Sequence, residues 1–88
     1  MSVIVMSLVW RHFPIGSTEL LIMLAFADWG DDHGKSIYPT VKTLADKVRL
    51  SPRQVHRKLG VLKKAGFINY VGITEYGAKR LAIDIERL

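Results

Sequence analysis

The sequence predicts a mainly α-helical fold that ends in a small β-hairpin. Three observations lead to this prediction: capping residues precede apolar stretches, residues 52–65 form a strongly amphipathic helical pattern, and apolar residues alternate near the C-terminus. The 88 residues suffice for one small domain and are too few for two, so we expect a single domain over residues 1–88. A chain of this size is compatible both with a whole protein and with the N-terminal part of a longer one.

The first expected element covers residues 3–10, which are apolar and rich in β-branched side chains. Such a stretch can form a strand, but Ser2 can also cap a short helix that extends to about His12, and the helix is the preferred interpretation. Pro14 and Gly16 then interrupt the chain. The stretch is too short to span a membrane and no basic residue precedes it, so neither a membrane span nor a signal peptide is expected.

A second helix is expected over residues 18–29, with Ser17 as its N-cap and Glu19 in the first turn, where the helix dipole favours a negative charge. Residues 20–27 are apolar almost all round, which predicts that this helix is covered on two sides. One side is expected to contact the following helices. The other side is expected to contact the N-terminal segment or a second copy of the chain.

The two tryptophans, Trp10 and Trp29, are most simply residues of the hydrophobic core. The alternative is that they anchor an interface, because the apolar N-terminal half is large for one small domain. If the chain forms a homodimer, residues 3–29 are therefore the expected interface.

The middle of the chain is expected to hold a loop at residues 30–34 and a short strand at residues 36–38, which Pro39 closes. Thr40 is the expected N-cap of a helix over residues 41–48. Arg49 and Leu50 then form a turn.

The clearest helix start lies at Ser51, a favourable N-cap that precedes Pro52 at the first helical position, where a missing N–H costs nothing. The helix is expected to continue to Ala65 and to end at Gly66, a left-handed C-cap. Residues 40–66 therefore form two short helices joined by a tight turn.

The helix over residues 52–65 has two chemically different faces when it is projected at about 100° per residue. One face is an apolar stripe of Val55, Leu59 and Leu62, whereas the opposite face holds Arg53, Arg57 and Lys64 with Gly60 among them, flanked by Gln54 and His56. Arginine can pair with guanine O6 and N7, and glutamine with adenine N6 and N7. The missing side chain of Gly60 permits close approach of a DNA backbone. The alternative is an ordinary solvated basic face.

A hairpin is expected after this helix, with strands at residues 67–71 and 79–85. The second strand carries the alternating apolar residues Leu81, Ile83 and Ile85. The loop between the strands contains Glu75 as its only charged residue, and the basic pair Lys79 and Arg80 lies at its far end. Contacts of the hairpin with nucleic acid should therefore be few and directed to phosphate.

Residues 44–68 follow the pattern L-A-x-x-x-x-x-S-x-R-x-V-x-R-x-L-x-x-L-x-x-x-G-F-I. This pattern closely resembles the winged helix-turn-helix domain of bacterial, plasmid and phage DNA-binding proteins, including replication-initiation proteins. The resemblance covers residues 17–88. It implies three core helices, a helix-turn-helix at residues 40–66, a β-hairpin wing at residues 67–86, and a short N-terminal helix or strand. Arg49 departs from the glycine that many relatives carry at the turn, which suggests a turn that avoids positive φ.

The resemblance implies sequence-specific binding of double-stranded DNA through a recognition helix over residues 52–65, by a transcriptional regulator or the DNA-binding domain of a replication initiator. The candidate DNA-binding residues are Ser51, Arg53, Gln54, His56, Arg57, Lys64, Lys79 and Arg80, with Lys42, Lys47 and Lys63 as further candidates for phosphate contacts. Such a protein is expected in the cytoplasm of a bacterial cell or a phage-infected host. The rival interpretation is a winged helix that docks other proteins, because a fold does not fix a function.

Composition is compatible with an anionic partner, since the net charge is +5. The absence of cysteine excludes disulfides and thiolate metal sites. Residues 30–36 imitate a phosphate-binding loop but are one residue short of its spacing. Asp28, Asp31, Asp32 and His33 are more simply an acidic solvated loop than a metal site. We expect no catalytic residues, no cofactor and no metal.

Overall fold

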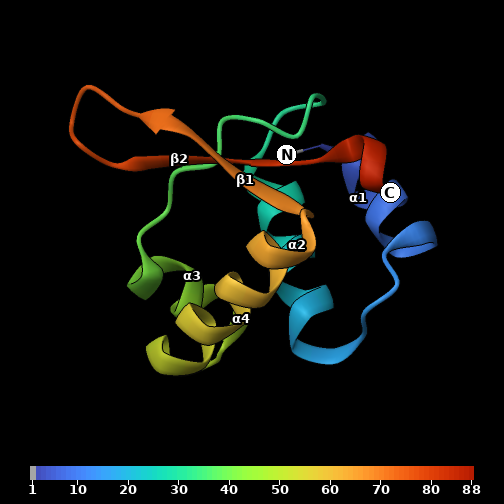
Figure 1. Cartoon of the computed structure of the whole chain (residues 1–88), viewed down its shortest axis with the longest axis horizontal. Helices are drawn as coiled ribbons and strands as arrows, with labels where there is room; N and C mark the ends of the chain where they lie inside the picture. Colours follow the sequence, from blue (N-terminus) through green and yellow to red (C-terminus); the bar gives the residue numbers. More distant parts are fainter. Residues whose placement is uncertain (1) are drawn as a thin grey trace.

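Figure 1 shows the computed structural model of the chain, which describes residues 2–88. Four helices are followed by a two-stranded antiparallel hairpin and a short 3-10 helix. The elements are α1 (Val3–His12), α2 (Ser17–Trp29), α3 (Val41–Val48), α4 (Pro52–Ala65), β1 (Ile68–Ile73), β2 (Lys79–Ile83) and the 3-10 helix η1 (Ile85–Arg87). This mainly helical arrangement with a C-terminal hairpin confirms the predicted fold class and is consistent with a winged helix-turn-helix.

Helix α1 begins at the cap predicted from the sequence. The Ser2 hydroxyl oxygen accepts a hydrogen bond from the Val5 N–H at 3.0 Å, and the same hydroxyl donates to Asp32 at 2.9 Å. The Ser2 N–H also donates to the Ala27 carbonyl at 3.1 Å, which ties the start of α1 to the end of α2. The helical interpretation of the N-terminal segment is therefore confirmed.

The outer face of α1 is unusually apolar. Val5 and Val9 are fully buried against α2, but Val3, Ile4 and Trp10 remain exposed, and 62% of Trp10 is accessible to solvent. The assignment of Trp10 to the core is therefore wrong, because the face of α1 that contacts α2 is the one that carries the two valines.

Helix α2 is the centre of the core. Ile22, Met23 and Phe26 are fully buried, and the helix contacts α1, α3, α4 and β2. The predicted two-sided burial is confirmed, and α1 supplies the second side. The predicted Ser17 cap is wrong: α2 begins at Ser17 itself, whose φ is 57°, and Gly16 occupies the cap position without a side-chain hydrogen bond.

Helices α3 and α4 form the helix-turn-helix, and the turn between them differs from the prediction. Arg49 adopts a left-handed conformation with φ 60° and ψ 42°, so the expectation that this turn avoids positive φ is wrong. This conformation lets the Leu50 N–H return to the Ala45 carbonyl at 3.1 Å and closes the end of α3. A non-glycine residue in this conformation costs roughly 1–2 kcal/mol, which the capping bonds and the packing of both helices offset.

The hairpin is irregular, since its register shifts between Tyr70 and Gly72 and leaves Val71 as an extra residue in β1. Strand β2 ends at Ile83, so the predicted extension of this strand through Ile85 is wrong; residues 85–87 form η1 instead. The short strand expected at residues 36–38 is reduced to one bridge between Ile37 and Leu81. The bridge closes the inner end of the hairpin onto the loop that precedes α3.

Among the described residues, no helix has the length and apolar character needed to cross a membrane.

Candidate nucleic-acid interface

Helix α4 presents the two faces that its sequence predicts. Val55, Leu59 and Leu62 are buried in the core, which fixes the rotation of the helix about its axis. As a result, Arg53 and Arg57 lie on the solvent side. Among residues 2–88, neither guanidinium group forms an ion pair with a carboxylate. Both groups are therefore available to an external anion or base edge.

The N-terminal half of α4 brings four candidate residues together. Arg53, Gln54, His56 and Arg57 line one shallow hollow on the surface. Ser51 lies at the tip of the helix as the N-cap. The hollow combines guanidinium, amide and imidazole donors in one place, which is the chemistry that reads base edges in a DNA groove.

Ser51 and Gln54 are also committed to each other through a capping box. The Ser51 hydroxyl oxygen accepts from the Gln54 N–H at 3.2 Å, and the Gln54 side-chain oxygen accepts from the Ser51 N–H at 3.1 Å. The Gln54 carboxamide therefore presents its NH₂ group outward while its oxygen is engaged. In this state Gln54 can donate to a base acceptor, whereas the bidentate pairing with adenine requires that the capping box opens.

Lys64 and Gly60 lie farther along α4. Lys64 is exposed in the last turn and does not line the hollow of Arg53 and Arg57. A Cβ atom added at Gly60 would have no neighbouring atom within 4 Å, so the surface here is open. The close approach of a DNA backbone to Gly60 stays a prediction.

The structure separates the two basic residues of the wing. Lys79 lines a cavity between α4 and the hairpin, whereas Arg80 lines a different hollow together with Tyr38 and Tyr76. Successive residues of a strand point to opposite faces, which explains the separation. Lys79 and Arg80 therefore cannot act as one basic pair on the same surface.

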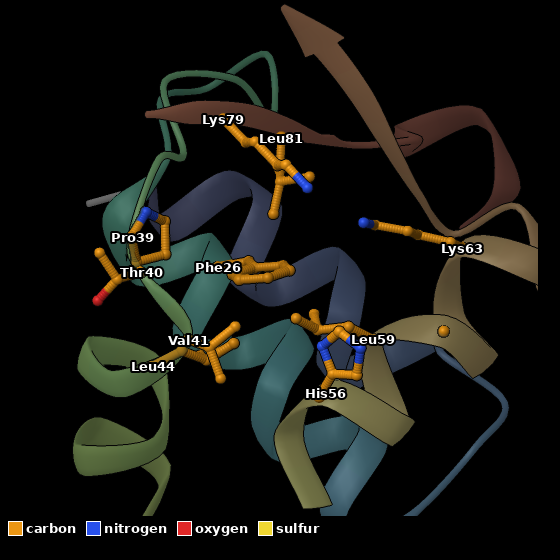
Figure 2. A pocket seen from close by; sticks show the side chains of 11 residues that line it. Phe26, Pro39, Thr40, Val41, Leu44, His56, Leu59, Lys63, Lys79 and Leu81 are labelled. Atoms are coloured by element: carbon orange, nitrogen blue, oxygen red, sulfur yellow. The ribbon is translucent and has the colours of Figure 1, made fainter. Parts of the chain in front are cut away.

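Figure 2 shows the cavity beside Lys79, which we call the α3–α4–β2 cavity. It has a volume of about 300 Å³, and its lining includes His56, Gly60 and Lys63 from α4. Each of these residues and Lys79 stands out in the sequence, but their meeting in one cavity was not predicted. Only the tertiary arrangement of β2 relative to α3 and α4 brings Lys79 to this cavity, and no local sequence signal reports that arrangement.

Three other lysines are engaged within the protein. Lys42 pairs with Asp46 of the same helix at 3.1 Å on the exposed surface. Lys47 pairs with Asp28 at 2.6 Å and lies over the Trp29 ring at 4.9 Å from its centroid. The Lys47 hydrogen bond lowers the pKa of Asp28. Lys58 pairs with Glu19 at 3.1 Å and ties α4 to α2. Lys47 is therefore a weaker candidate for a phosphate contact than the sequence suggested.

The acidic loop between α2 and α3 has a structural role. Asp31 accepts hydrogen bonds from the backbone N–H groups of His33 at 2.9 Å and Lys35 at 3.0 Å. The bond from Lys35 is the main cause that lowers the pKa of Asp31. Within the described residues, no group of three or more His, Cys, Asp or Glu side chains is arranged to hold a metal ion.

Comparison with known proteins matches residues 15–68 to the family described as a helix-turn-helix domain. The match runs from the start of α2 through α4 to the first residue of β1, and membership of this family suggests DNA binding. No curated protein and no solved structure matches the chain. Because the family match spans more than half of the 88 residues, the chain belongs to the helix-turn-helix domain family.

Proposed function

We propose that the chain binds double-stranded DNA in a sequence-specific manner by inserting α4 into the major groove. The observation that carries this proposal is the convergence of Arg53, Gln54, His56 and Arg57 on one exposed hollow at the N-terminal half of α4. Arginine and glutamine distinguish bases by the donor and acceptor pattern of the major groove. Buried Val55 holds these side chains on a rigid helix, which limits the conformational entropy lost on binding.

The protein acts by binding and not by catalysis. Its role is that of a transcriptional regulator or of the DNA-binding domain of a replication initiator, in the cytoplasm of a bacterial cell or a phage-infected host. Lys63, Lys64 and Lys79 contact the phosphate backbone and set the register of α4 on the duplex. Arg80 lines a hollow on the other face of the hairpin, so it makes no contact with DNA when α4 and Lys79 face the duplex.

The test is a binding titration with a random duplex at two salt concentrations. Non-specific phosphate contacts should give measurable affinity at ~50 mM salt and a steep loss of affinity towards ~200 mM salt. Selection of bound sequences from a random pool then reports base preference. If no binding is detectable even at ~50 mM salt, the proposed function fails, because phosphate attraction should be present there first.

A homodimer through the outer face of α1 is the second part of the proposal. Val3, Ile4 and Trp10 are exposed on this helix, with the exposed polar residues Ser7 and Arg11 between them. Figure 1 places α1 at the opposite side of the molecule from α3, so pairing through α1 leaves the helix-turn-helix free. Half-sites in the DNA would then recur about one helical turn apart. Sedimentation should show a dimer that Trp10→Ser converts to a monomer; a wild-type monomer at high concentration would contradict the pairing.

A docking module for another protein is the alternative function, and one observation favours it. The hairpin exposes the apolar side chains of Tyr70, Val71, Ile73 and Tyr76, and 90% of Tyr76 is accessible. Random-duplex binding separates the two functions. Under the DNA proposal, Tyr76→Ser leaves DNA affinity within about twofold, since surface changes away from the contacts have small effects.

A further inference from the structure

The α3–α4–β2 cavity is a separate feature from the hollow on α4 that Arg53, Gln54, His56 and Arg57 line. The two share only His56 among their lining residues. The volume of about 300 Å³ lies at the lower end of the range for pockets that hold small organic molecules. The cavity is therefore large enough for a ligand with a small ring system or a short aliphatic body.

The floor of the cavity is apolar and is built by four different elements. It consists of Phe26 from α2, Leu44 from α3, Leu59 from α4 and Leu81 from β2, as Figure 2 shows. These four residues belong to the buried core, with 0–8% of each exposed, so the apolar surface that a ligand can reach comes mainly from the partly exposed Pro39 and Val41 beside them. The floor is therefore preformed in the folded chain, which favours binding because few side chains lose conformational freedom when a ligand binds.

The rim of the cavity is cationic. Figure 2 shows that Lys63 and Lys79 extend from opposite walls towards the space between α4 and β2. No acidic residue lines the cavity, and neither lysine forms an ion pair within residues 2–88. The imidazole of His56 adds a third polar group to the rim. Two uncompensated positive charges over an apolar floor complement a molecule that is apolar at one end and anionic at the other.

Gly60 leaves the α4 wall of this cavity open. Apart from Gly60, its chain neighbours and the backbone of its own helix, no atom lies within 4 Å of the position that a Cβ would occupy, although glycine destabilises a helix interior relative to alanine. Because Gly60 lines the cavity, a larger side chain at this position can reach its entrance. Gly60 thus keeps a path between solvent and the floor, and it offers a way to close that path by substitution.

We propose that the α3–α4–β2 cavity binds a small organic anion, whose apolar body lies on the floor and whose anionic group contacts Lys63 and Lys79. The same two lysines face the phosphate backbone in the DNA complex, so occupation of the cavity competes with DNA. This competition rests on the proposed function, whereas binding of the anion itself does not.

The test uses 8-anilino-1-naphthalenesulfonate, which combines two ring systems with one sulfonate, and measures its fluorescence with the full chain and without DNA. We expect saturable binding at one site. The uncharged analogue N-phenyl-1-naphthylamine should bind at least about tenfold more weakly, because it lacks the charge-assisted contacts. Equal affinity for the two probes would overturn recognition of the anion.

Variants locate the site. The double substitution Lys63→Gln and Lys79→Gln should weaken sulfonate binding by about tenfold or more, while Lys64→Gln, outside the cavity, is the matched control and should leave it unchanged. Gly60→Leu should abolish binding and keep the helical circular dichroism spectrum, since leucine is a strong helix former. Binding by folded Gly60→Leu with wild-type affinity would overturn the site.

Amide chemical shifts of the wild-type chain give a measurement that needs no variant. Binding of the probe should change the amide chemical shifts of Thr40, Gly60 and Leu81. Changes confined to the exposed face of α1 would overturn the assignment to the cavity. A short random duplex should then displace the bound probe. If the probe occupies the cavity and DNA binds without displacing it, the proposed competition between the anion and DNA is wrong. If DNA does not bind at all, the proposed function fails, whereas the anion site stands.

Discussion

Helix α4 and the β1–β2 hairpin each bury one face against the core, but they expose opposite chemistry. The free side of α4 carries Arg53, Gln54 and Arg57, whereas the free side of the hairpin carries Tyr70 and Val71 among other apolar residues. Under the proposed function, DNA affinity should therefore depend mainly on the helix. The hairpin exposes more apolar than basic side chains, since only Lys79 and Arg80 among its residues are cationic.

The irregularity in β1 contributes to this difference. In a regular strand, neighbouring residues alternate between buried and exposed faces. The alternation is already lost at Asn69 and Tyr70, which are both exposed, and the extra residue Val71 that follows them is exposed as well. The outer part of the hairpin therefore extends beyond the core with apolar side chains on its surface, while Leu81 and Ile83 at its inner end remain buried.

The largest expected effect on stability comes from a substitution on the buried face of α4. Substitutions on the exposed faces of α4 and of the hairpin should have much smaller effects. Leu62 is fully buried, so Leu62→Ala should lower the free energy of unfolding by about 2–5 kcal/mol through lost contacts and a residual cavity. Urea unfolding monitored by circular dichroism measures this change. Val61→Ala in the same helix and Val71→Ala in the hairpin are exposed controls and should each change it by less than about 0.5 kcal/mol. A loss below about 1 kcal/mol for Leu62→Ala would show that α4 is not held by this packing.

The next effect tests whether the exposed face of α4 reads bases. Arg57→Ala should cost about 1–3 kcal/mol of binding free energy at the selected site and should relax base preference at one position. Fluorescence anisotropy with specific and random duplexes measures both quantities. Lys64→Ala serves as a matched control in the same helix, because loss of a phosphate contact weakens all sequences similarly. If Arg57→Ala also weakens all sequences equally, Arg57 contacts phosphate and the base-reading role passes to Arg53 or Gln54.

A smaller effect distinguishes the two faces of the hairpin. Lys79→Ala should reduce the slope of log affinity against log salt by about one, because one phosphate contact is lost. Arg80→Ala should leave the slope unchanged, since Arg80 lines the opposite face with Tyr76. Equal changes of this slope in the two variants would mean that both faces of the hairpin contact DNA, with the hairpin inserted edge-on into a groove.

Features fixed by local sequence were predictable. Ser2, Thr40 and Ser51 cap helices as expected, and Gly66 ends α4 with a left-handed φ of 84°. Each of these motifs depends on atoms within four residues. Ser17 is the exception, because its positive φ places it inside the first turn of α2 and not before it. The left-handed Arg49 could not be predicted from residue preference, since packing of α3 against α4 overrides that preference.

The candidate site was predictable only where one helix contains it. The helical period of α4 was enough to place Arg53, Gln54 and Arg57 on one surface. The meeting of Lys63 with Lys79 depends on how the hairpin folds back across α4, and the pairing of Lys47 with Asp28 joins residues 19 positions apart. Trp10 was misplaced for the same reason, because only the contact between α1 and α2 decides which apolar residues of α1 are covered.

The smallest expected effect concerns the ion pair that joins α4 to α2. Hydrogen bonds from Thr18 and then Lys58 lower the pKa of Glu19, whose side chain is 14% exposed. A lowered pKa means that the charged carboxylate stabilises the folded state above the ordinary pKa of glutamic acid. This stabilisation is lost as the pH falls through the lowered pKa of the folded state. Since the Lys58 side chain is 25% exposed, solvent limits the contribution to less than about 1 kcal/mol.

The pH dependence of unfolding isolates this pair. Wild-type protein should be more stable than Glu19→Gln by less than about 1 kcal/mol near neutral pH, and the difference should shrink as the solution becomes acidic. Glu75→Gln is the control, because Glu75 lies in the exposed hairpin loop and forms no ion pair among the described residues. If the difference for Glu19→Gln were constant with pH, the charge on Glu19 would contribute nothing. The rotation of α4 that directs Arg53 and Arg57 outward would then depend on its buried residues alone.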